Sequence, residues 1–211
     1  MSACTPTVVH LVAPAAQPVL VWRFEPTLCA LSSAPVGGGP AMLAWICNIG
    51  VGLDYDRTDL DRHASEVATE AALSGPGAAL FTAADTTCWH RAGDGEVVAD
   101  ATVGLTQPTW AAGANGSFTP WSPGTINLVA QLPVGLDPAG AVNAVMTLTE
   151  AKSQALLEAG VPGTGTASDA AVVCWPAEVA TERFAGPRSP WGSRLARAVH
   201  SAVAAGIAAG Q

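Results

Sequence analysis

Charged side chains are scarce in this chain of 211 residues, because Asp, Glu, Lys and Arg together make up only 12% of it. Acidic residues outnumber basic residues by seventeen to nine, which gives a formal net charge of −8. A surface with this charge repels the phosphate backbone of nucleic acids. We therefore expect no nucleic-acid partner.

Long apolar runs are also missing, although 49% of the residues are hydrophobic. No run approaches the length of about eighteen residues that marks a membrane-spanning helix. The start of the chain does not resemble a secretory signal, because three prolines precede Arg23, its first basic side chain. We expect a cytoplasmic protein that has no membrane partner.

Several motifs that carry known chemistry are absent. The five cysteines are widely spaced and form no CxxC pair, and the four histidines show no HxxxH spacing. The chain also has no GxSxG nucleophile elbow and no phosphate-binding P-loop. We therefore expect reduced thiols, no metal site and no bound cofactor.

Apolar patterns typical of strands are frequent, and no linker or repeat divides the chain. We expect one domain over residues 1–211 of the α+β (mixed α/β) class, with a mixed, largely antiparallel sheet flanked by about three helices. The Gly-Asp-Gly at 93–95 predicts a hairpin turn. The expected strands are 8–12, 18–24, 28–32, 42–51, 78–82, 87–90, 96–103, 121–132 and 170–175.

The expected helices are residues 58–73, 138–159 and a final helix that begins at Pro190. In the final helix the apolar residues Leu195, Val199, Val203 and Ile207 lie four apart. At about 100° per residue, the middle helix should bury one stripe, with Glu150 and Lys152 at its two edges. The predicted stripe is Val142, Val145, Met146, Thr149, Ser153, Leu156 and Leu157, while Thr147, Ala151, Gln154 and Glu158 face away.

The strand before this helix has two different faces. Its alternation places Ile126, Leu128, Ala130 and Leu132 on one side, and Thr125, Asn127 and Gln131 with Val129 on the other. The polar side is typical either of a solvent-facing antiparallel strand or of the wall of a polar cleft.

Two glycine-rich turns could bring backbone close to a ligand, namely LSSAPVGGGP at 31–40 and GTGTASD at 163–169. Asp169 in the second turn could act as an acid, a base or a hydrogen-bond acceptor. An ordinary flexible turn explains the same residues equally well.

Five segments give the chain a family resemblance, and they are LSSAPVGGG at 31–39, PGTINLVAQL at 123–132, TLTEAKSQAL at 147–156, GTGTASDAAVV at 163–173 and FAGPRSPWGSRLARAV at 184–199. From about residue 28 to 203, the order and spacing of these segments resemble the adenosylcobinamide amidohydrolase (CbiZ) family. The chain departs from the family pattern in NIGVGLDYD at 48–56 and at Ala167 and Ser168.

The resemblance implies an enzyme that hydrolyses the amide between the aminopropanol arm and adenosylcobinamide, giving adenosylcobyric acid in corrinoid salvage. The small-molecule substrate would carry its own cobalt corrin. We expect Glu150 or Asp169 as the base, Lys152 or turn amides as oxyanion donors, and Asn127 as an orienting group. Ser33, Thr125 and Thr166 stay open as nucleophiles. The expected substrate-binding residues are Ser32, Ser33, Gly37, Gly38, Gly39, Asn48, Thr82, Thr125, Thr164, Gly165 and Thr166.

Two other classes of function remain open. A corrinoid-binding module without catalysis would share the same turns, and an amidase or aminopeptidase could act on an unrelated amide. The sequence is equally compatible with a monomer and with a homo-oligomer, because small residues on the last two helices could pack a dimer.

Overall fold

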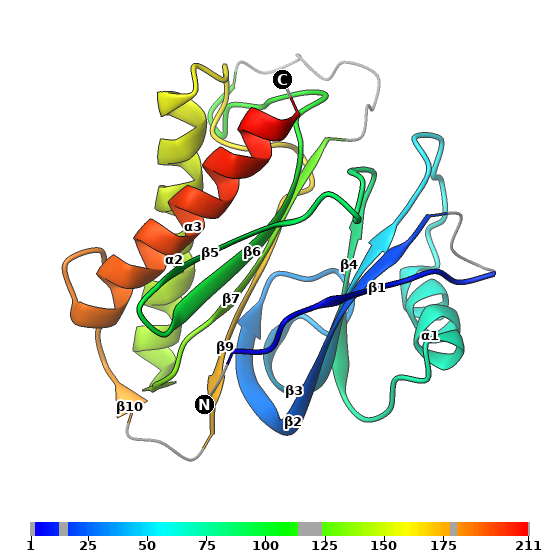
Figure 1. Ribbon diagram of the computed structural model, residues 1–211, viewed down its shortest axis with the longest axis horizontal. Coiled ribbons are helices and arrows are strands. Elements are labelled where there is room, and N and C mark those ends of the chain that lie inside the picture. Colours follow the sequence, from blue (N-terminus) through cyan, green and yellow to red (C-terminus); the bar gives the residue numbers. More distant parts are fainter. Residues whose placement is uncertain (1–2, 13–16, 114–123, 178–180, 211) are drawn as a thin grey trace.

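The structure is a computed structural model that describes residues 3–12, 17–113, 124–177 and 181–210 (Figure 1). An eight-stranded mixed sheet has the order β4-β3-β2-β9-β7-β6-β5, with β1 paired to β2, and β8 and β10 form a small separate sheet. The elements are β1 Thr7–Val9, β2 Val19–Ser32, β3 Gly39–Gly50, α1 Leu60–Glu70, β4 Gly77–Thr82, β5 His90–Asp94, β6 Val97–Gly104, β7 Thr125–Gln131, β8 Gly135–Leu136, α2 Pro138–Glu158, β9 Ala170–Pro176, β10 Thr181–Glu182 and α3 Pro190–Ala209.

The large sheet is mostly antiparallel, and only the β3–β4 and β7–β9 pairs within it are parallel. This arrangement with three helices confirms the expected α+β class. None of the helices in the described part of the chain combines the length and the hydropathy that a membrane crossing requires.

The sheet bends into two leaves that face each other (Figure 1). One leaf contains β2, β3 and β4 and is covered by α1, and the other contains β5, β6, β7 and β9 and is covered by α2 and α3. Strand β2 belongs to both, because its first half pairs with β1 and β3 and its second half pairs with β3 and β9. The bend brings β4 against β7, where the Asn127 amide donates to the Phe81 carbonyl at 3.0 Å.

Three apolar clusters hold these layers together. One lies between α1 and its leaf, one between the two leaves, and the largest between the second leaf and the helices α2 and α3. Strand β7 shows why its sequence has two faces. Ile126 and Leu128 pack toward α2 and α3, whereas Thr125 and Asn127 point into the space between the leaves. All seven residues of β7 are buried, so the solvent-facing interpretation is wrong.

The predicted starts of α2 and α3 are confirmed, whereas α1 begins at Leu60, two residues after the expected start at 58, and Asp59 makes no capping hydrogen bond with its side chain. The Asp137 carboxylate accepts from the amide of Gly140 at 2.7 Å, and Ser189 accepts from the amide of Gly192 at 3.0 Å. Each cap is followed by a proline, which lacks the amide that would otherwise be unsatisfied there. In the final helix, the four apolar residues at four-residue spacing are all buried.

Two strand predictions need correction. Residues 18–24 and 28–32 form one continuous strand, although its pairing register with β3 shifts between Arg23 and Leu28. The strand predicted at 87–90 is shifted along the chain, because residues 87–89 are not in a strand and residues 90–94 form β5. The hairpin turn that follows β5 is at Gly95, which has a φ of 61°. The predicted strand 121–132 begins at Thr125, and its positions 121–123 lie outside the described residues.

The predicted buried face of α2 is largely wrong, although Leu156 is buried and Gln154 and Glu158 are exposed as expected. Thr147 and Ala151 are buried, whereas Val142 and Met146 are each 54% exposed. The helix packs its small residues against α3 and the sheet, because small side chains let these layers approach closely. Periodicity predicted that Glu150 and Lys152 lie at the two edges of the buried stripe. Instead, Glu150 is exposed and Lys152 is buried. The buried residues are Gly140, Ala141, Ala144, Thr147, Leu148, Ala151, Lys152, Ala155 and Leu156.

Candidate active site

A pocket of about 470 Å³ lies at one end of the space between the two leaves. Five segments line it: the turn after β2, the segment from β3 into α1, the end of β4, the start of β7 and the turn that leads into β9. Among the predicted site residues, this pocket brings together Ser33, Thr82, Thr125 and Asp169. The turn at 31–40 and the turn at 163–169 thus meet in space, although about 130 residues separate them in the sequence.

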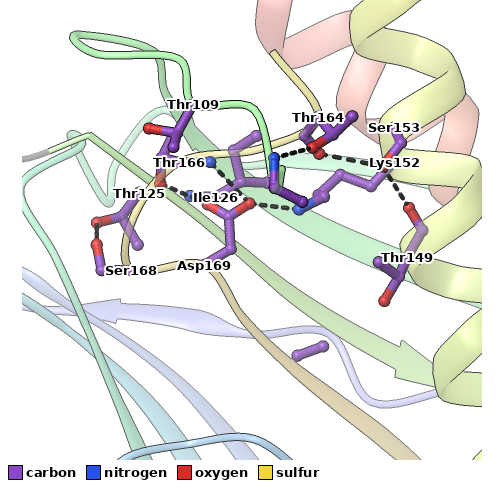
Figure 2. Close-up of polar contacts among 12 residues, drawn as sticks. Thr109, Thr125, Ile126, Thr149, Lys152, Ser153, Thr164, Thr166, Ser168 and Asp169 are labelled. Atoms are coloured by element: carbon purple, nitrogen blue, oxygen red, sulfur yellow. Dashed lines mark hydrogen bonds and ion pairs between the residues drawn. The ribbon is translucent and has the colours of Figure 1, made fainter. Parts of the chain in front are cut away.

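Behind the pocket wall, the ammonium group of Lys152 forms an ion pair with the carboxylate of Asp169 (Figure 2). Lys152 projects from α2, and Asp169 sits immediately before β9. The two side chains are only 10% and 15% exposed. Lys152 is also the only lysine in the sequence, a signal that sequence reasoning did not use.

The Asp169 carboxylate is held by three further hydrogen bonds. Its Oδ1 accepts from the Ile126 amide at 2.9 Å and from the Thr166 hydroxyl at 2.6 Å, and its Oδ2 accepts from the Thr166 amide at 3.1 Å. With Lys152, these donors occupy the four acceptor positions that a carboxylate offers. Asp169 thus joins β7, α2 and the turn before β9 in one network.

A pair of hydroxyl groups lies beside this network. Thr125 and Ser168 are 2.7 Å apart between their side-chain oxygens, and both line the pocket. Ser168 donates its proton to the carbonyl of Gly124 at 3.1 Å, so Thr125 donates to Ser168. The lone pairs of Thr125 that remain are available to a ligand. The sequence analysis did not select Ser168.

The turn at 163–169 has a structural requirement for glycine. A Cβ atom on Gly165 would collide with the Asp169 carboxylate and the Lys152 ammonium, so only glycine lets the backbone pass the ion pair. Thr164 faces away from the pocket, where its hydroxyl accepts from the amide of Ala111 at 3.2 Å (Figure 2). Gly165 and Thr166 support Asp169, and Thr164 supports the neighbouring loop.

Asn127 and Asn48 lie deeper between the leaves and do not line the pocket. Asn127 donates to Asn48 at 2.8 Å, and Asn48 donates to the Thr102 hydroxyl at 2.9 Å. Both asparagines are at most 3% exposed. The Oδ1 atom of Asn127 has no partner among the described residues. The geometry makes Asn127 a group that ties β7 to β3 and β4, one layer behind the pocket.

Other predicted site residues lie outside the pocket. Glu150 is on the open face of α2, so the expectation that it reaches the cleft is wrong. Ser32 accepts from the amide of Ala34 at 2.9 Å and thus stabilises its own turn. Gly37 has a φ of 69° and packs on the carbonyl of Gly77, while Gly38 packs on the carbonyl of Ala34. Gly39 has a φ of 85° and open space where a Cβ would lie, so its backbone conformation explains the glycine, and none of the three glycines lines the pocket.

The opposite wall of the pocket comes from a segment that sequence reasoning treated only as a departure from the family pattern. Tyr55, the only tyrosine in the sequence, lines the pocket and stacks on Phe81 with ring centroids 6.1 Å apart. Its hydroxyl is 2.7 Å from Nδ1 of His63 on α1. Arg57 also lines the pocket and is held by Asp59 at 2.8 Å and Glu66 at 3.0 Å.

The titrating groups near this wall and the buried thiols have shifted pKa values. Burial lowers the pKa of His63 and raises the pKa of Tyr55. Hydrogen bonds from Arg57 hold the pKa of Asp59 at about 2. Burial raises the pKa of Cys47 to about 12, which makes this thiol unreactive at neutral pH.

Metal ligands are not clustered in the described part of the chain. No group of three or more His, Cys, Asp or Glu side chains there is arranged to hold a metal ion. The expectation that the site uses no metal and no cofactor stays a prediction.

Comparison with known proteins agrees with the resemblance. The model of the family described as CbiZ, adenosylcobinamide amidohydrolase, matches residues 5–211. A curated protein from Halobacterium salinarum named adenosylcobinamide amidohydrolase is 37% identical over 119 residues, which cover 54% of this chain. The match spans about half the length of that relative, 51%. Because the family model covers nearly the whole chain, this protein belongs to the adenosylcobinamide amidohydrolase family.

Proposed function

We propose that this protein hydrolyses the amide bond that joins the aminopropanol arm to adenosylcobinamide, giving adenosylcobyric acid and free aminopropanol in corrinoid salvage. One observation carries the proposal. Segments that resemble the family come from the turn after β2, the start of β7, helix α2 and the turn before β9, and they meet at or directly behind one pocket. The family and the printed name of the Halobacterium salinarum relative support this chemistry.

The size and lining of the pocket suit the arm of the substrate better than its ring. A volume of about 470 Å³ is in the range of sites for drug-sized ligands. Apolar side chains such as Val51, Leu60 and Phe81 share the lining with hydroxyl groups and the Asp169 carboxylate. In this proposal the amide arm enters the pocket and the broad corrin ring lies across its mouth.

Amide hydrolysis needs a base that takes a proton from water while the water oxygen attacks the carbonyl carbon. The carbon–nitrogen bond then breaks, and the departing amine takes up a proton. Of the two carboxylates expected as the base, Asp169 lines the pocket and Glu150 does not, so we assign this role to Asp169. All four acceptor positions of Asp169 are occupied, so the rotatable hydroxyl of Thr166 must release Oδ1 for water to bind there.

The hydroxyl of Thr125 and the ion pair have supporting roles in this scheme. Thr125 offers lone pairs to the N–H of the substrate amide, which would orient the arm beside Asp169. Lys152 contacts the carboxylate from the helix side and does not line the pocket. We assign it to holding Asp169 in place, not to contact with the developing oxyanion.

The test is to incubate the purified protein with adenosylcobinamide and to follow adenosylcobyric acid and aminopropanol by mass spectrometry. Asp169→Asn should abolish product, whereas Glu150→Gln, on the exposed face of the same helix that carries Lys152, should leave turnover unchanged. A parallel reaction with a chelator should also be unchanged, since we expect no metal. Full turnover by the Asp169→Asn protein would refute the assignment of the base.

The same assay separates the other classes of function. A binding module would retain adenosylcobinamide on the protein and release no aminopropanol. An amidase of different specificity would leave adenosylcobinamide untouched and cleave other amides. Either result would overturn the proposed activity.

A further inference from the structure

The geometry points to Tyr55 as a catalytic hydrogen-bond donor, which gives its phenolic proton to the carbonyl oxygen of the bound amide while His63 holds its oxygen from behind. This inference rests on the proposed function, because the amide of the substrate is the ligand that Tyr55 would contact. It concerns the wall of the pocket opposite Asp169, to which no role in the reaction has been given above.

The first step is the placement of the two side chains. Tyr55 lies between β3 and α1 and lines the pocket, whereas His63 is on α1 and only 2% exposed. The hydroxyl of Tyr55 and Nδ1 of His63 are 2.7 Å apart. The rings of both residues pack on Phe81, with centroids 6.1 Å and 5.6 Å from it. These contacts fix the position of the hydroxyl of a residue that lines the pocket.

The second step is the direction of the hydrogen bond. A neutral imidazole carries one proton, and Nε2 of His63 is buried without a partner among the described residues. A proton on Nε2 would leave a buried N–H unsatisfied, and such orphaned donors are rare in folded proteins. The proton is therefore on Nδ1 and is donated to the oxygen of Tyr55. The phenolic proton of Tyr55 is then free for a group in the pocket.

The third step is the charge on the pair. Burial lowers the pKa of His63, and the nearby guanidinium of Arg57 acts in the same direction, while Glu66 and Asp59 oppose it. Burial also raises the pKa of Tyr55, against the effect of Arg57. Both groups are thus neutral at pH 7, so Tyr55 is a protonated donor and His63 is a neutral one.

A donor at this position has a defined use in amide hydrolysis. As water attacks, negative charge develops on the carbonyl oxygen, and a preorganised donor stabilises that charge more than it stabilises the neutral amide. Lys152 does not line the pocket, so it does not supply this donor. Tyr55 lines the pocket from the segment between β3 and α1, whereas Thr125 and Asp169 line it from β7 and the turn before β9, so we place donor and base on opposite sides of one amide.

The kinetic test is a double-mutant cycle with adenosylcobinamide as substrate. Tyr55→Phe should lower kcat by about 10²- to 10³-fold, as loss of an oxyanion donor does, with a small change in KM. His63→Leu should lower kcat about tenfold, in the range seen when a group that orients a functional side chain is removed. His63→Asn should restore much of this loss, because the asparagine amide can donate from near the position of Nδ1. Asp61→Asn, an exposed change on α1, is the control and should have no effect.

The cycle also separates a positioning role from an independent one. Because His63 acts through Tyr55, His63→Leu should cause no further loss in the Tyr55→Phe background. An equal loss in both backgrounds would overturn the role of His63. Turnover of the Tyr55→Phe protein within twofold of the unmodified protein would overturn the role of Tyr55.

A spectroscopic test separates this inference from the proposed function. In ligand-free protein labelled with ¹⁵N-histidine, the signal of His63 is the one that disappears in the His63→Asn variant. Its chemical shifts should be those of an imidazole protonated at Nδ1. Shifts of a ring protonated at Nε2 would overturn the inference, whether or not the protein hydrolyses any substrate. Since Tyr55 is the only tyrosine, ¹³Cζ-tyrosine gives one resonance, which should shift when adenosylcobinamide is added to the Asp169→Asn protein. If the corrin absorbance shows saturable binding but the tyrosine resonance does not shift, the role of Tyr55 is also overturned.

Discussion

Breaking the Lys152–Asp169 ion pair should reduce stability as well as activity. Both side chains are at least 85% buried, and removal of one partner from a buried pair costs about 3–5 kcal/mol. Lys152→Met leaves Asp169 with three hydrogen bonds from Ile126 and Thr166, so we expect the lower end, about 3 kcal/mol. Asp169→Asn leaves the buried ammonium without its counter-ion, so we expect the upper end, about 5 kcal/mol.

The assay is urea unfolding at pH 7, with the free energy of unfolding taken by linear extrapolation. Glu150→Gln is the control, because this exposed change on the same helix should stay within about 0.5 kcal/mol of the unmodified protein. The double variant Lys152→Met, Asp169→Asn should be less destabilised than the sum of the two single changes. Loss of less than about 1 kcal/mol in both single variants would refute the view that this pair is buried and coupled.

Other expectations follow from burial and packing. In the native protein Cys88 should react with a thiol reagent, whereas Cys47 and Cys174, whose pKa values burial raises, should react only after unfolding; native labelling of either would contradict their buried positions. Gly165→Ala should abolish activity, because the added methyl collides with the ion pair, and retention of full turnover would show that the turn has room. His63 has a lowered pKa in the folded state, so its contribution to stability is present above about pH 6.5 and lost as pH falls below that value. The free energy of unfolding should therefore fall more steeply from pH 7.5 to 5.5 than it does in His63→Leu, and equal slopes would contradict the shift.

Sequence reasoning predicted the elements that local rules determine. The starts of α2 and α3 follow from a capping side chain and a proline, and both rules held at Asp137 and Ser189. The two faces of β7 follow from simple alternation, and they identified Thr125 as a pocket residue. Gly165 was expected to bind substrate but does not line the pocket, and the close approach of its backbone to the ion pair explains the glycine.

The remaining errors came from long-range packing. Hydrophobic periodicity gives weight to large side chains, so it predicted burial of Val142 and Met146, whereas α2 packs through alanines. The exposed position of Glu150 follows from that rotation of the helix. The bend of the sheet depends on contacts between distant strands and has no local signal, so the meeting of Tyr55 and Asp169 at one pocket could not be predicted. Attention to single occurrences would have helped, since the one lysine and the one tyrosine both lie at or behind this pocket.

Strand β2 runs through both leaves, and this limits how the protein can change shape. A protein whose two halves are joined by a flexible linker can clamp down on a ligand by rotating one half. Here β2 continues across the junction and pairs with β3 on both sides of the register shift between Arg23 and Leu28, so such a rotation would have to break its pairs with β3 or β9. Adjustment to a bulky substrate must then come from the loops at the rim of the pocket, and the two leaves should keep the same relative position when a ligand binds.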